Sequence, residues 1–506
     1  MFAQDVPSGI VIDDKVYTVD TLIERQIGPG TVYRRLRLPD YPLNVNMLTV
    51  DMTDPSVRVE TSQAHDRLFA VEPLVDAAAR RSHTGHKAIG GANANFWCVT
   101  PNYPYSELLL ARTFNANVSN GMIITETNCN MDQWDNGPRQ NGEFGVGEDG
   151  LAYSGHHLWH SVLRSDADSC IIGGVNKVCY DNEAVAYNSY YGCDRPFRTA
   201  DIVMRDTGKH GFDTVSCAAT EVLLRLAPGE RWRAGNPMKF IVGEVRDNAG
   251  SGILGEYDIA VVGRGDRRNA LRALVPGSEV SLSCSWTTLD GKPMAYENMV
   301  GGNAQVMVGG ELTRFCKDSG YCRTAYSRCG YGASSDHSTM YIVVVDKSVD
   351  PEYGPSVGCS SGVMSRIARH YGCSDMTSMD AGGSAQLLVG NRIVNKTTEA
   401  TPRPVANGML IFDESPADNE VVRIEFDARR LILASGDKAD ISVLAYNRYG
   451  SLIDIAPGNI TLGCDSGAGS VCGNVFTAAA PGQGIITATY KGFVARLPVE
   501  VVAGRQ

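Results

Sequence analysis

The sequence lacks the patterns by which several common enzyme classes are recognised. It contains no His-Glu-x-x-His and no phosphate-binding P-loop pattern, which argues against the usual zinc proteases and P-loop enzymes. No apolar run approaches the roughly 18–20 residues that cross a bilayer, so we expect a protein that is not transmembrane. The net charge of -11 argues against nucleic acid or an anionic membrane as the main partner. We expect no cofactor.

The fourteen cysteines include no Cys-x-x-Cys pair, so the spacing of zinc ribbons is missing. An even number scattered through a long chain is typical of an exported protein with disulfides; reduced cysteines in the core are the alternative. Several cysteines stand at distances that suit hairpins: Cys170 with Cys179, Cys464 with Cys472, and the trio Cys316, Cys322 and Cys329. Cys359 and Cys373 lie near opposite ends of an expected helix over 361–370, about 20 Å apart, which is beyond a disulfide.

The N-terminus, MFAQDVPSG, has neither the basic nor the apolar part of a signal peptide. For a protein that is secreted, periplasmic or at the cell surface, this implies that a signal peptide was removed.

With 506 residues, the chain is long enough for two or three domains. Alternating apolar and polar residues predict strands over 32–60 and 339–348 and many short strands between 145 and 291. Helical spacing of apolar residues predicts amphipathic helices in 68–81 and 361–372. We therefore predict an α+β protein in which a mixed β-sheet domain with few helices is followed by a small all-β sandwich.

The texture of the sequence changes near Asp413, where DESPADNE is acidic, contains a proline and is typical of a linker. The residues that follow alternate as short strands at the spacing of a β-sandwich, and the two cysteines there are expected to pair with each other.

Four polar clusters stand at the ends of expected strands, where loops usually carry function. They are NANFW from Asn93, YCRTAYS from Tyr321, DAGGS from Asp380 and TPRPVANG from Thr401. Together they would suit a phosphorylated sugar, because arginine binds phosphate through two parallel hydrogen bonds and backbone N–H groups at a glycine corner can wrap an anion. Each cluster alone has a structural explanation: a buried arginine–carboxylate pair, or a plain Gly-Gly turn.

Apart from these four clusters, the segment GHHLWH places His156, His157 and His160 close together. His156 and His160 would share a face only in a helix, whereas the flanking sequence resembles strands. We favour a surface or core cluster over a metal site, and predict no metal ligands.

Read together, the polar clusters resemble the phosphodiester glycosidase family. AIGGANANFW is similar to its Asn-Gly-x-Phe-Phe segment, and YCRTAYS with MYIVVVD to its Arg-Thr-Ala strand pair. SMDAGGSAQLLVGNRIVN is similar to its Leu-Asp-Gly-Gly-Gly-Ser hairpin, and TPRPVANGMLIF to its closing Arg-Pro-Val-Ala-Asn strand. The resemblance spans roughly residues 25–413. It implies a 1–24 extension, a catalytic domain over 25–415 and, from a separate resemblance to bacterial Ig-like domains, a sandwich over 420–506.

The resemblance implies hydrolysis of a sugar-1-phosphodiester, such as N-acetylglucosamine 1-phosphate linked to a sugar or glycan, at the anomeric carbon. The implied catalytic residues are Asp380, Arg323 and Arg403. The implied substrate and phosphate ligands are Asn95, Thr324, Gly382, Gly383, Ser384 and Asn407.

The sequence departs from the family pattern at Ala381, which stands where the family has its first glycine, and at Asn93–Asn95. Ala381 adds a Cβ that narrows the expected pocket or requires φ below zero. This leaves three hypotheses: the glycosidase, a non-catalytic protein for glycan binding or envelope assembly with the same fold, and a metal-dependent hydrolase that uses the His156 cluster.

Overall fold

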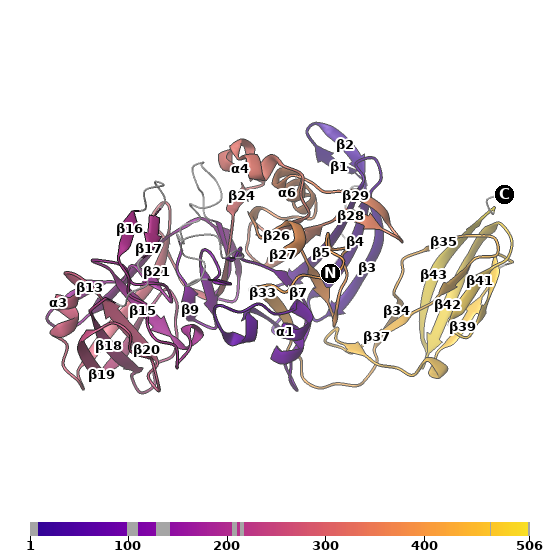
Figure 1. Cartoon of the computed structure of the whole chain (residues 1–506). Helices are drawn as coiled ribbons and strands as arrows, with labels where there is room; N and C mark the ends of the chain where they lie inside the picture. Colours follow the sequence, from indigo (N-terminus) through magenta and orange to yellow (C-terminus); the bar gives the residue numbers. More distant parts are fainter. Residues whose placement is uncertain are drawn as a thin grey trace.

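The computed structural model describes residues 9–98, 110–127, 142–204, 210–212, 217–465 and 467–503. Strands make up most of it, and in this described part no helix is long and apolar enough to span a membrane. Figure 1 shows three regions along the molecule. We call them the lobe (148–295, magenta to rose), the central body (20–147 and 296–413, indigo and orange strands) and the C-terminal region (423–503, yellow).

The middle of the central body is an antiparallel sheet of eight strands. In spatial order these are β25 (Glu311–Leu312), β24 (Ala304–Val308), β30 (Asp375–Ser378), β26 (Arg328–Ala333), β27 (Thr339–Val345), β5 (Leu43–Asp51), β4 (Thr31–Leu38) and β3 (Asp20–Gly28). The strands predicted over 32–60 and 339–348 are therefore confirmed. Strand β3 crosses the boundary predicted at residue 24, and a hairpin of β1 (Gly9–Ile12) and β2 (Lys15–Thr18) precedes it.

A second antiparallel sheet packs against the first. Its order is β32 (Arg392–Ile393), β31 (Leu387–Val389), β7 (Lys87–Asn93), β33 (Asn407–Asp413) and β6 (Val57–Gln63). Both of these sheets are antiparallel throughout, whereas the nine-stranded sheet of the lobe contains the parallel pair β14–β15 among antiparallel ones and is mixed, as predicted. The predicted hairpin after the DAGGS corner is confirmed as β31 and β32, whose turn places Gly390 at φ 61°.

Strand alternation explains the layers of the central body. Even-numbered residues of β27, such as Ile342, join the core between the two sheets, whereas odd-numbered ones, such as Val343, pack toward helix α6 (Ser361–His370). Helix α1 (Leu74–Arg81) covers the outer face of the second sheet. Successive side chains of a strand point to opposite faces, so a sheet covered on both sides is apolar in both parities. The result is four layers: α6, sheet, sheet and α1.

Both predicted amphipathic helices are present. Helix α6 begins as expected, with Ser360 as its N-cap accepting a hydrogen bond from the Val363 N–H at 3.1 Å. Helix α1 is shorter than the predicted 68–81 because Pro73 stands at its N-cap, where a proline begins a helix more readily than it continues one.

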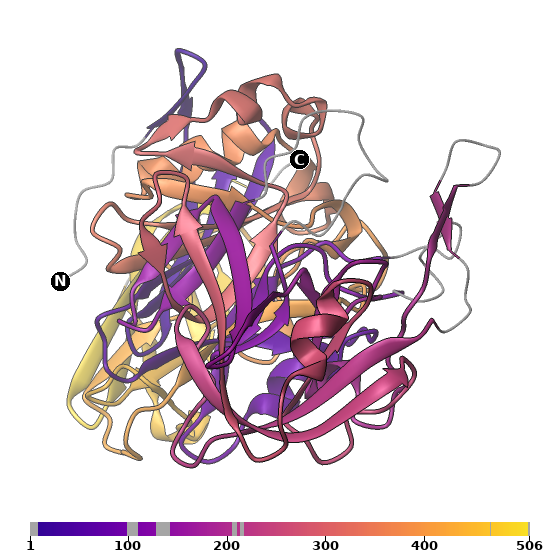
Figure 2. The same ribbon diagram turned by 90° about the vertical axis from the view of Figure 1, so that its left-hand side faces the viewer.

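The lobe is an insertion between two neighbouring strands of the central body. The chain enters along β10 (Gly142–Gly147) and returns along β23 (Tyr296–Gly302), which pair antiparallel from Gly142 opposite Gly302 to Gly147 opposite Tyr296. Strands β11 (Ala152–Gly155), β8 (Asn117–Ser119) and β9 (Met122–Thr125) complete this sheet. The lobe appears on the left of Figure 1 and toward the viewer in Figure 2.

Short strands fill the lobe, as the sequence predicts. They are β12 (His157–Arg164), β13 (Ser169–Ile171), β14 (Gly174–Val175), β15 (Ala184–Asn188), β18 (Ala219–Leu226), β19 (Pro237–Ala249), β20 (Ile259–Gly263), β21 (Glu279–Thr288) and β22 (Pro293–Met294), with helix α3 (Arg267–Arg272) and the hairpin β16 (Ile202–Met204) and β17 (His210–Phe212). Trp286, Phe240 and Met238 lie in its core.

The C-terminal region holds three small sheets around a core that includes Phe476, Ile486 and Leu497. Its strands are β34 (Arg423–Phe426), β35 (Leu431–Ala434), β36 (Lys438–Asp440), β37 (Val443–Tyr446), β38 (Leu452–Ile453), β39 (Thr461–Cys464), β40 (Gly469–Cys472), β41 (Val475–Ala478), β42 (Gly482–Tyr490) and β43 (Phe493–Val502). The preceding linker, 414–422, contains no strand. An Ig-like topology for this region stays a prediction.

No disulfide joins any two cysteines in the described part of the chain, which departs from the predicted pairs. Cys464 and Cys472 end strands that belong to different sheets. The predicted trio is divided by the eight-stranded sheet: Cys329 lies in the core between the two sheets, whereas Cys316 and Cys322 lie in the core beneath α6. Spacing along the sequence did not reveal which face of the sheet each thiol would occupy.

Candidate active site

Asp380 lies where the chain passes from one sheet of the central body to the other. Strand β30 of the first sheet ends at Ser378, and β31 of the second begins at Leu387. The Asp380 N–H donates to the Ala94 carbonyl at 2.9 Å, and Asn93 Nδ2 donates to the Asp380 carbonyl at 2.9 Å. The end of β7 therefore fixes the backbone that presents this carboxyl group.

The glycines after Asp380 have different environments. Gly382 has φ 67° and would place a Cβ with no atom within 4 Å, so its corner is open but requires a left-handed backbone. A Cβ on Gly383 would overlap Arg403 Nη2 and Glu399 Oε1. Ala381 has an extended backbone at φ -123°, which tolerates a side chain. The departure from the family glycine therefore causes no backbone strain.

The Asp380 carboxyl group is half-buried, and burial raises its pKa to about 6. The Ser384 hydroxyl, the Ala381 N–H at 2.9 Å from Oδ1 and the Arg403 charge each lower this pKa by less. Ser384 Oγ is buried and makes no well-aligned hydrogen bond within the described structure, although it lies near enough to act on the carboxyl. A carboxyl that titrates near neutral pH suits proton transfer or nucleophilic chemistry.

Arg403 covers Gly383 and faces the same corner as Asp380. Its Nε donates to Glu399 Oε1 at 3.1 Å, and its Nη2 also pairs with Glu399. The side chains of Arg403 and Glu399 are 38% and 40% exposed, and such exposed pairs contribute little to stability, at most about 1 kcal/mol. A phosphate can therefore compete with Glu399 for this guanidinium group.

Asn95 and Asn407 are buried and bonded to each other. Asn407 Nδ2 donates to Asn95 Oδ1 at 2.8 Å, and the Asn95 N–H donates to Asn407 Oδ1 at 2.9 Å. Asn95 Nδ2 donates to two carbonyls, and its Oδ1 also accepts from the Gly301 N–H at 3.0 Å. The donors and acceptor of Asn95 are used inside the protein, which gives this amide pair a structural role; the predicted sugar contacts of Asn95 and Asn407 stay predictions.

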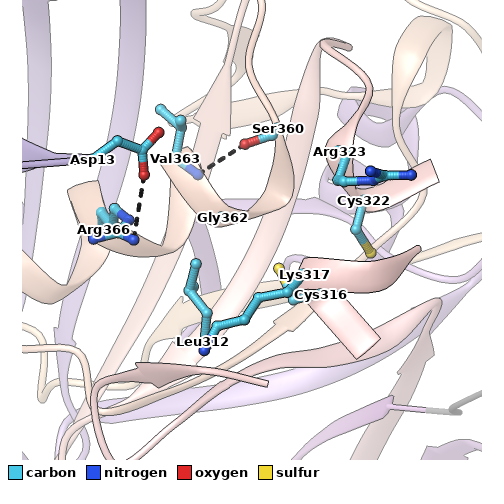
Figure 3. Close-up of a pocket in the computed structure, with 10 residues that line it drawn as sticks. All are labelled: Asp13, Leu312, Cys316, Lys317, Cys322, Arg323, Ser360, Gly362, Val363 and Arg366. Atoms are coloured by element: carbon cyan, nitrogen blue, oxygen red, sulfur yellow. Dashed lines mark hydrogen bonds and ion pairs between the residues drawn. The ribbon is translucent and has the colours of Figure 1, made fainter. Parts of the chain in front are cut away.

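Arg323 and Thr324 lie at the end of helix α5 (Gly320–Arg323), and both are exposed. The Thr324 hydroxyl donates to the Gly320 carbonyl at 2.8 Å. Arg323 lines a separate cavity of about 120 Å³, shown in Figure 3, and neither Asp380 nor Arg403 is among the residues that line it. The structure thus brings Asp380, Gly382, Gly383, Ser384 and Arg403 together and places Arg323 at a neighbouring hollow.

The sequence analysis assigns no role to two residues near this corner. Tyr321 is half-buried, which raises the pKa of its hydroxyl, and the nearby Asp380 charge raises that pKa further. Arg328 is fully buried, and its Nη2 donates to the Tyr321 carbonyl at 2.6 Å and to the Thr324 carbonyl at 2.5 Å. Of the two arginines in YCRTAYSR, the second therefore fixes the segment that carries the first. No sequence signal distinguishes them.

The histidine cluster does not converge on one site. His157 is buried, with Nδ1 3.2 Å from Glu143 Oε2 and Nε2 2.8 Å from the Tyr296 hydroxyl, whereas His160 is exposed. They lie on strand β12, not on a helix, so an odd spacing sends them to opposite faces. The cluster divides between core and surface, as the favoured interpretation of the sequence has it.

Residues 243–412 match the family described as phosphodiester glycosidase. The matched region begins within lobe strand β19 and includes Asp380, Arg323 and Arg403 but not Asn95. No curated protein matches the chain.

Solved structures show the same fold. A hypothetical protein from Synechocystis superposes with a TM-score of 0.51 and 14% identity, over 76% of this chain and 62% of that one. An exported protein from Burkholderia pseudomallei superposes with a TM-score of 0.51 and 18% identity, over 73% of this chain and 74% of that one. This chain thus spans less than two thirds of the Synechocystis protein.

The catalytic domain of zebrafish N-acetylglucosamine-1-phosphodiester alpha-N-acetylglucosaminidase, auto-inhibited by its pro-peptide, superposes with a TM-score of 0.33 and 9% identity, over 78% of this chain and 87% of that one. A superposition this loose supports no argument about function.

Proposed function

We propose that the protein is an exported phosphodiester glycosidase that hydrolyses a sugar-1-phosphodiester, such as N-acetylglucosamine 1-phosphate linked to a second sugar or glycan. The observation that carries the proposal is the corner itself: the half-buried Asp380, with a pKa raised to about 6, shares an open glycine turn with Arg403. The corner lies inside the region that matches the family. Export is supported by the description of the Burkholderia relative of similar fold.

The chemistry follows from the bond to be broken. Cleavage between the anomeric carbon and the phosphate oxygen leaves a phosphomonoester and an oxocarbenium-like carbon, to which water adds. Phosphate is a good leaving group, so its departure depends more on charge stabilisation than on strong acid assistance. Arg403 and the Gly383 N–H supply positive charge on the phosphate side, whereas the Gly382 N–H donates to the Ser327 carbonyl at 2.9 Å. Asp380 acts on the carbon side, where its carboxylate stabilises the cation or activates water.

Arg323 has a place in this proposal as a second phosphate ligand. Its side chain is exposed and lines the cavity, and its guanidinium group has no hydrogen bond or ion pair within the part of the chain that the structure describes, so this group is available for the phosphate or for the group attached to it. Thr324 stays in the proposal with it, because its exposed hydroxyl can still accept a hydrogen bond while it donates to Gly320.

The proposal is tested with a panel of sugar-1-phosphodiesters in water enriched in ¹⁸O. We expect free sugar and a phosphomonoester that contains no ¹⁸O, because the carbon–oxygen bond breaks and the phosphorus–oxygen bonds do not. Incorporation of ¹⁸O into the phosphate would show a phosphodiesterase instead. Glycan binding without turnover, unchanged by Asp380→Asn, would favour the non-catalytic alternative.

A further inference from the structure

Cys316 and Cys322 form a buried pair of thiols outside the Asp380 corner. Helix α4 (Arg314–Asp318) carries Cys316 and helix α5 carries Cys322, and Ser319 both ends α4 and caps α5. The two residues are 3% and 0% exposed. Both residues line the same cavity, and each thiol shifts the pKa of the other, so the two thiols are neighbours.

The pair lies on the wall of the cavity of Figure 3. Lys317 and Arg323 line the same cavity as the two cysteines. Both cationic side chains are exposed, which makes the mouth of the cavity electropositive. Reactive thiols in proteins are found in surroundings of this kind.

The surroundings also favour a thiolate on Cys322. The neighbouring Cys316 thiol is the largest cause that lowers the pKa of Cys322, and the Ser319 and Ser361 hydroxyls and the Arg328 charge lower it further, against the effect of burial. The neighbouring Cys322 thiol in turn raises the pKa of Cys316. Cys322 is therefore the thiol that more readily forms a thiolate, the attacking species, and Cys316 is the thiol that stays protonated until the second exchange.

We propose that Cys316 and Cys322 are a thiol–disulfide site: they are thiols in the structure and are joined by a disulfide when the protein meets an oxidising disulfide, such as oxidised glutathione or an oxidised dithiol protein. The electropositive mouth suits an anionic oxidant such as glutathione. The inference does not depend on the proposed glycosidase activity.

The reaction proceeds by two exchanges. The Cys322 thiolate attacks one sulfur of the oxidant, which forms a mixed disulfide and releases the first thiolate of the oxidant. Cys316 then loses its proton to solvent and attacks Cys322 Sγ, which releases the second thiolate. Two electrons pass from the cysteine pair to the oxidant, whose disulfide is reduced to two thiols.

The disulfide would join α4 and α5 across the residue where they meet. Cys322 stands between Tyr321, which interacts with Asp380, and Arg323, which lines the cavity. Oxidation would therefore fix the position of a segment that borders the candidate active site.

The experiment maps cysteines in the full-length protein. The protein is equilibrated with oxidised glutathione, unfolded in guanidinium chloride with excess N-ethylmaleimide, and digested with trypsin. Cleavage after Arg314, Lys317 and Arg323 places the two cysteines on different peptides. We expect these peptides to appear joined, two hydrogen atoms lighter than their sum, while Cys284 and Cys359 are alkylated. Dithiothreitol should restore alkylation at Cys316 and Cys322.

Two variants sharpen the result. Cys322→Ala should leave Cys316 alkylated after oxidation, and Cys193→Ser, at an exposed thiol of the lobe, should retain the joined peptides. Alkylation of both Cys316 and Cys322 after oxidation would overturn the proposal, as would glutathione attached to Cys322 with no joined peptide. The mapping of the unaltered chain decides the matter even if the Cys322 variant fails to fold.

Discussion

The Asp380 corner and the Asn95–Asn407 pair are adjacent in the structure, but their polar side chains differ in whether they bond within the protein or stay available to a ligand. The Asp380 N–H bonds the Ala94 carbonyl, one residue from Asn95. The Asn95 amide has used its hydrogen-bonding groups within the protein, whereas the carboxyl and the exposed pair at Arg403 retain groups for a ligand. A residue close to a site therefore takes part in ligand binding only if it has hydrogen-bond donors or acceptors that the protein itself does not use.

The largest effect should come from the reactive side of this comparison. Asp380→Asn should lower kcat on a sugar-1-phosphodiester by about 10³-fold or more, because it removes the carboxylate from the anomeric carbon. The free energy of unfolding at pH 7 should not fall. Asp375→Asn, at a partly exposed acid on β30 that accepts from the Gly309 N–H, is the matched control and should keep full activity. Equal activity of wild type and Asp380→Asn would contradict the assignment.

The structural side should respond in stability instead. Asn95→Ala removes the partner of several buried groups, including the Gly301 N–H and the Phe114 carbonyl, and should lower the free energy of unfolding by about 3 kcal/mol. Urea denaturation measures this effect, and KM of the remaining folded enzyme should be unchanged. A stable Asn95→Ala protein with a raised KM would show that Asn95 contacts the sugar after all.

The pKa of Asp380 near 6 predicts how both activity and stability change with pH. If the carboxylate is the working form, kcat/KM should rise with pH through about 6. Because the folded state holds this proton more tightly than the unfolded state, whose carboxyl titrates near 4, Asp380 should lower stability as pH rises from about 4 to 6. Asp380→Asn should lack this part of the decline in urea titrations. Identical pH profiles of stability would contradict the raised pKa.

The smallest contrast compares the two glycines of the corner. Gly383→Ala should displace Arg403, because its Cβ would overlap that guanidinium group, and raise KM several-fold. Gly382→Ala meets no atom but requires φ 67°, so it should cost about 1–2 kcal/mol of stability with a smaller change in KM. Kinetics and urea denaturation of the two variants separate the effects. A raised KM only in Gly382→Ala would reverse the assignment.

Much of the central body could be predicted because burial of one face of a strand or helix produces a regular spacing of apolar residues in the sequence. The apolar residues of β27 and of α6 follow the periods that burial imposes on a strand and a helix. Which strands pair could not be predicted, because partners such as β5 and β27 are distant in the sequence and no local pattern records that pairing.

The candidate site could be predicted only in part, for a similar reason. Asp380 and Arg403 stood out as an acid and a cation in turn-forming sequence, and the fold brings them together. The sequence, however, does not show whether an asparagine binds a sugar or, like Asn95, a backbone carbonyl. The cysteine trio likewise divided because Cys329 faces the other side of its sheet, which depends on strand parity and not on spacing.

The way in which the lobe is attached has a consequence for how this architecture can vary. The lobe begins after β10 and ends before β23, two paired strands in which Gly147 stands opposite Tyr296. A longer or shorter lobe would therefore leave the hydrogen bonds between β10 and β23 unchanged. Related proteins could replace the whole lobe by a short turn, or enlarge it, while the Asp380 carboxyl group between the two sheets kept its position. We therefore expect substrate preference to vary through changes in the lobe, and the residues around Asp380 to be conserved.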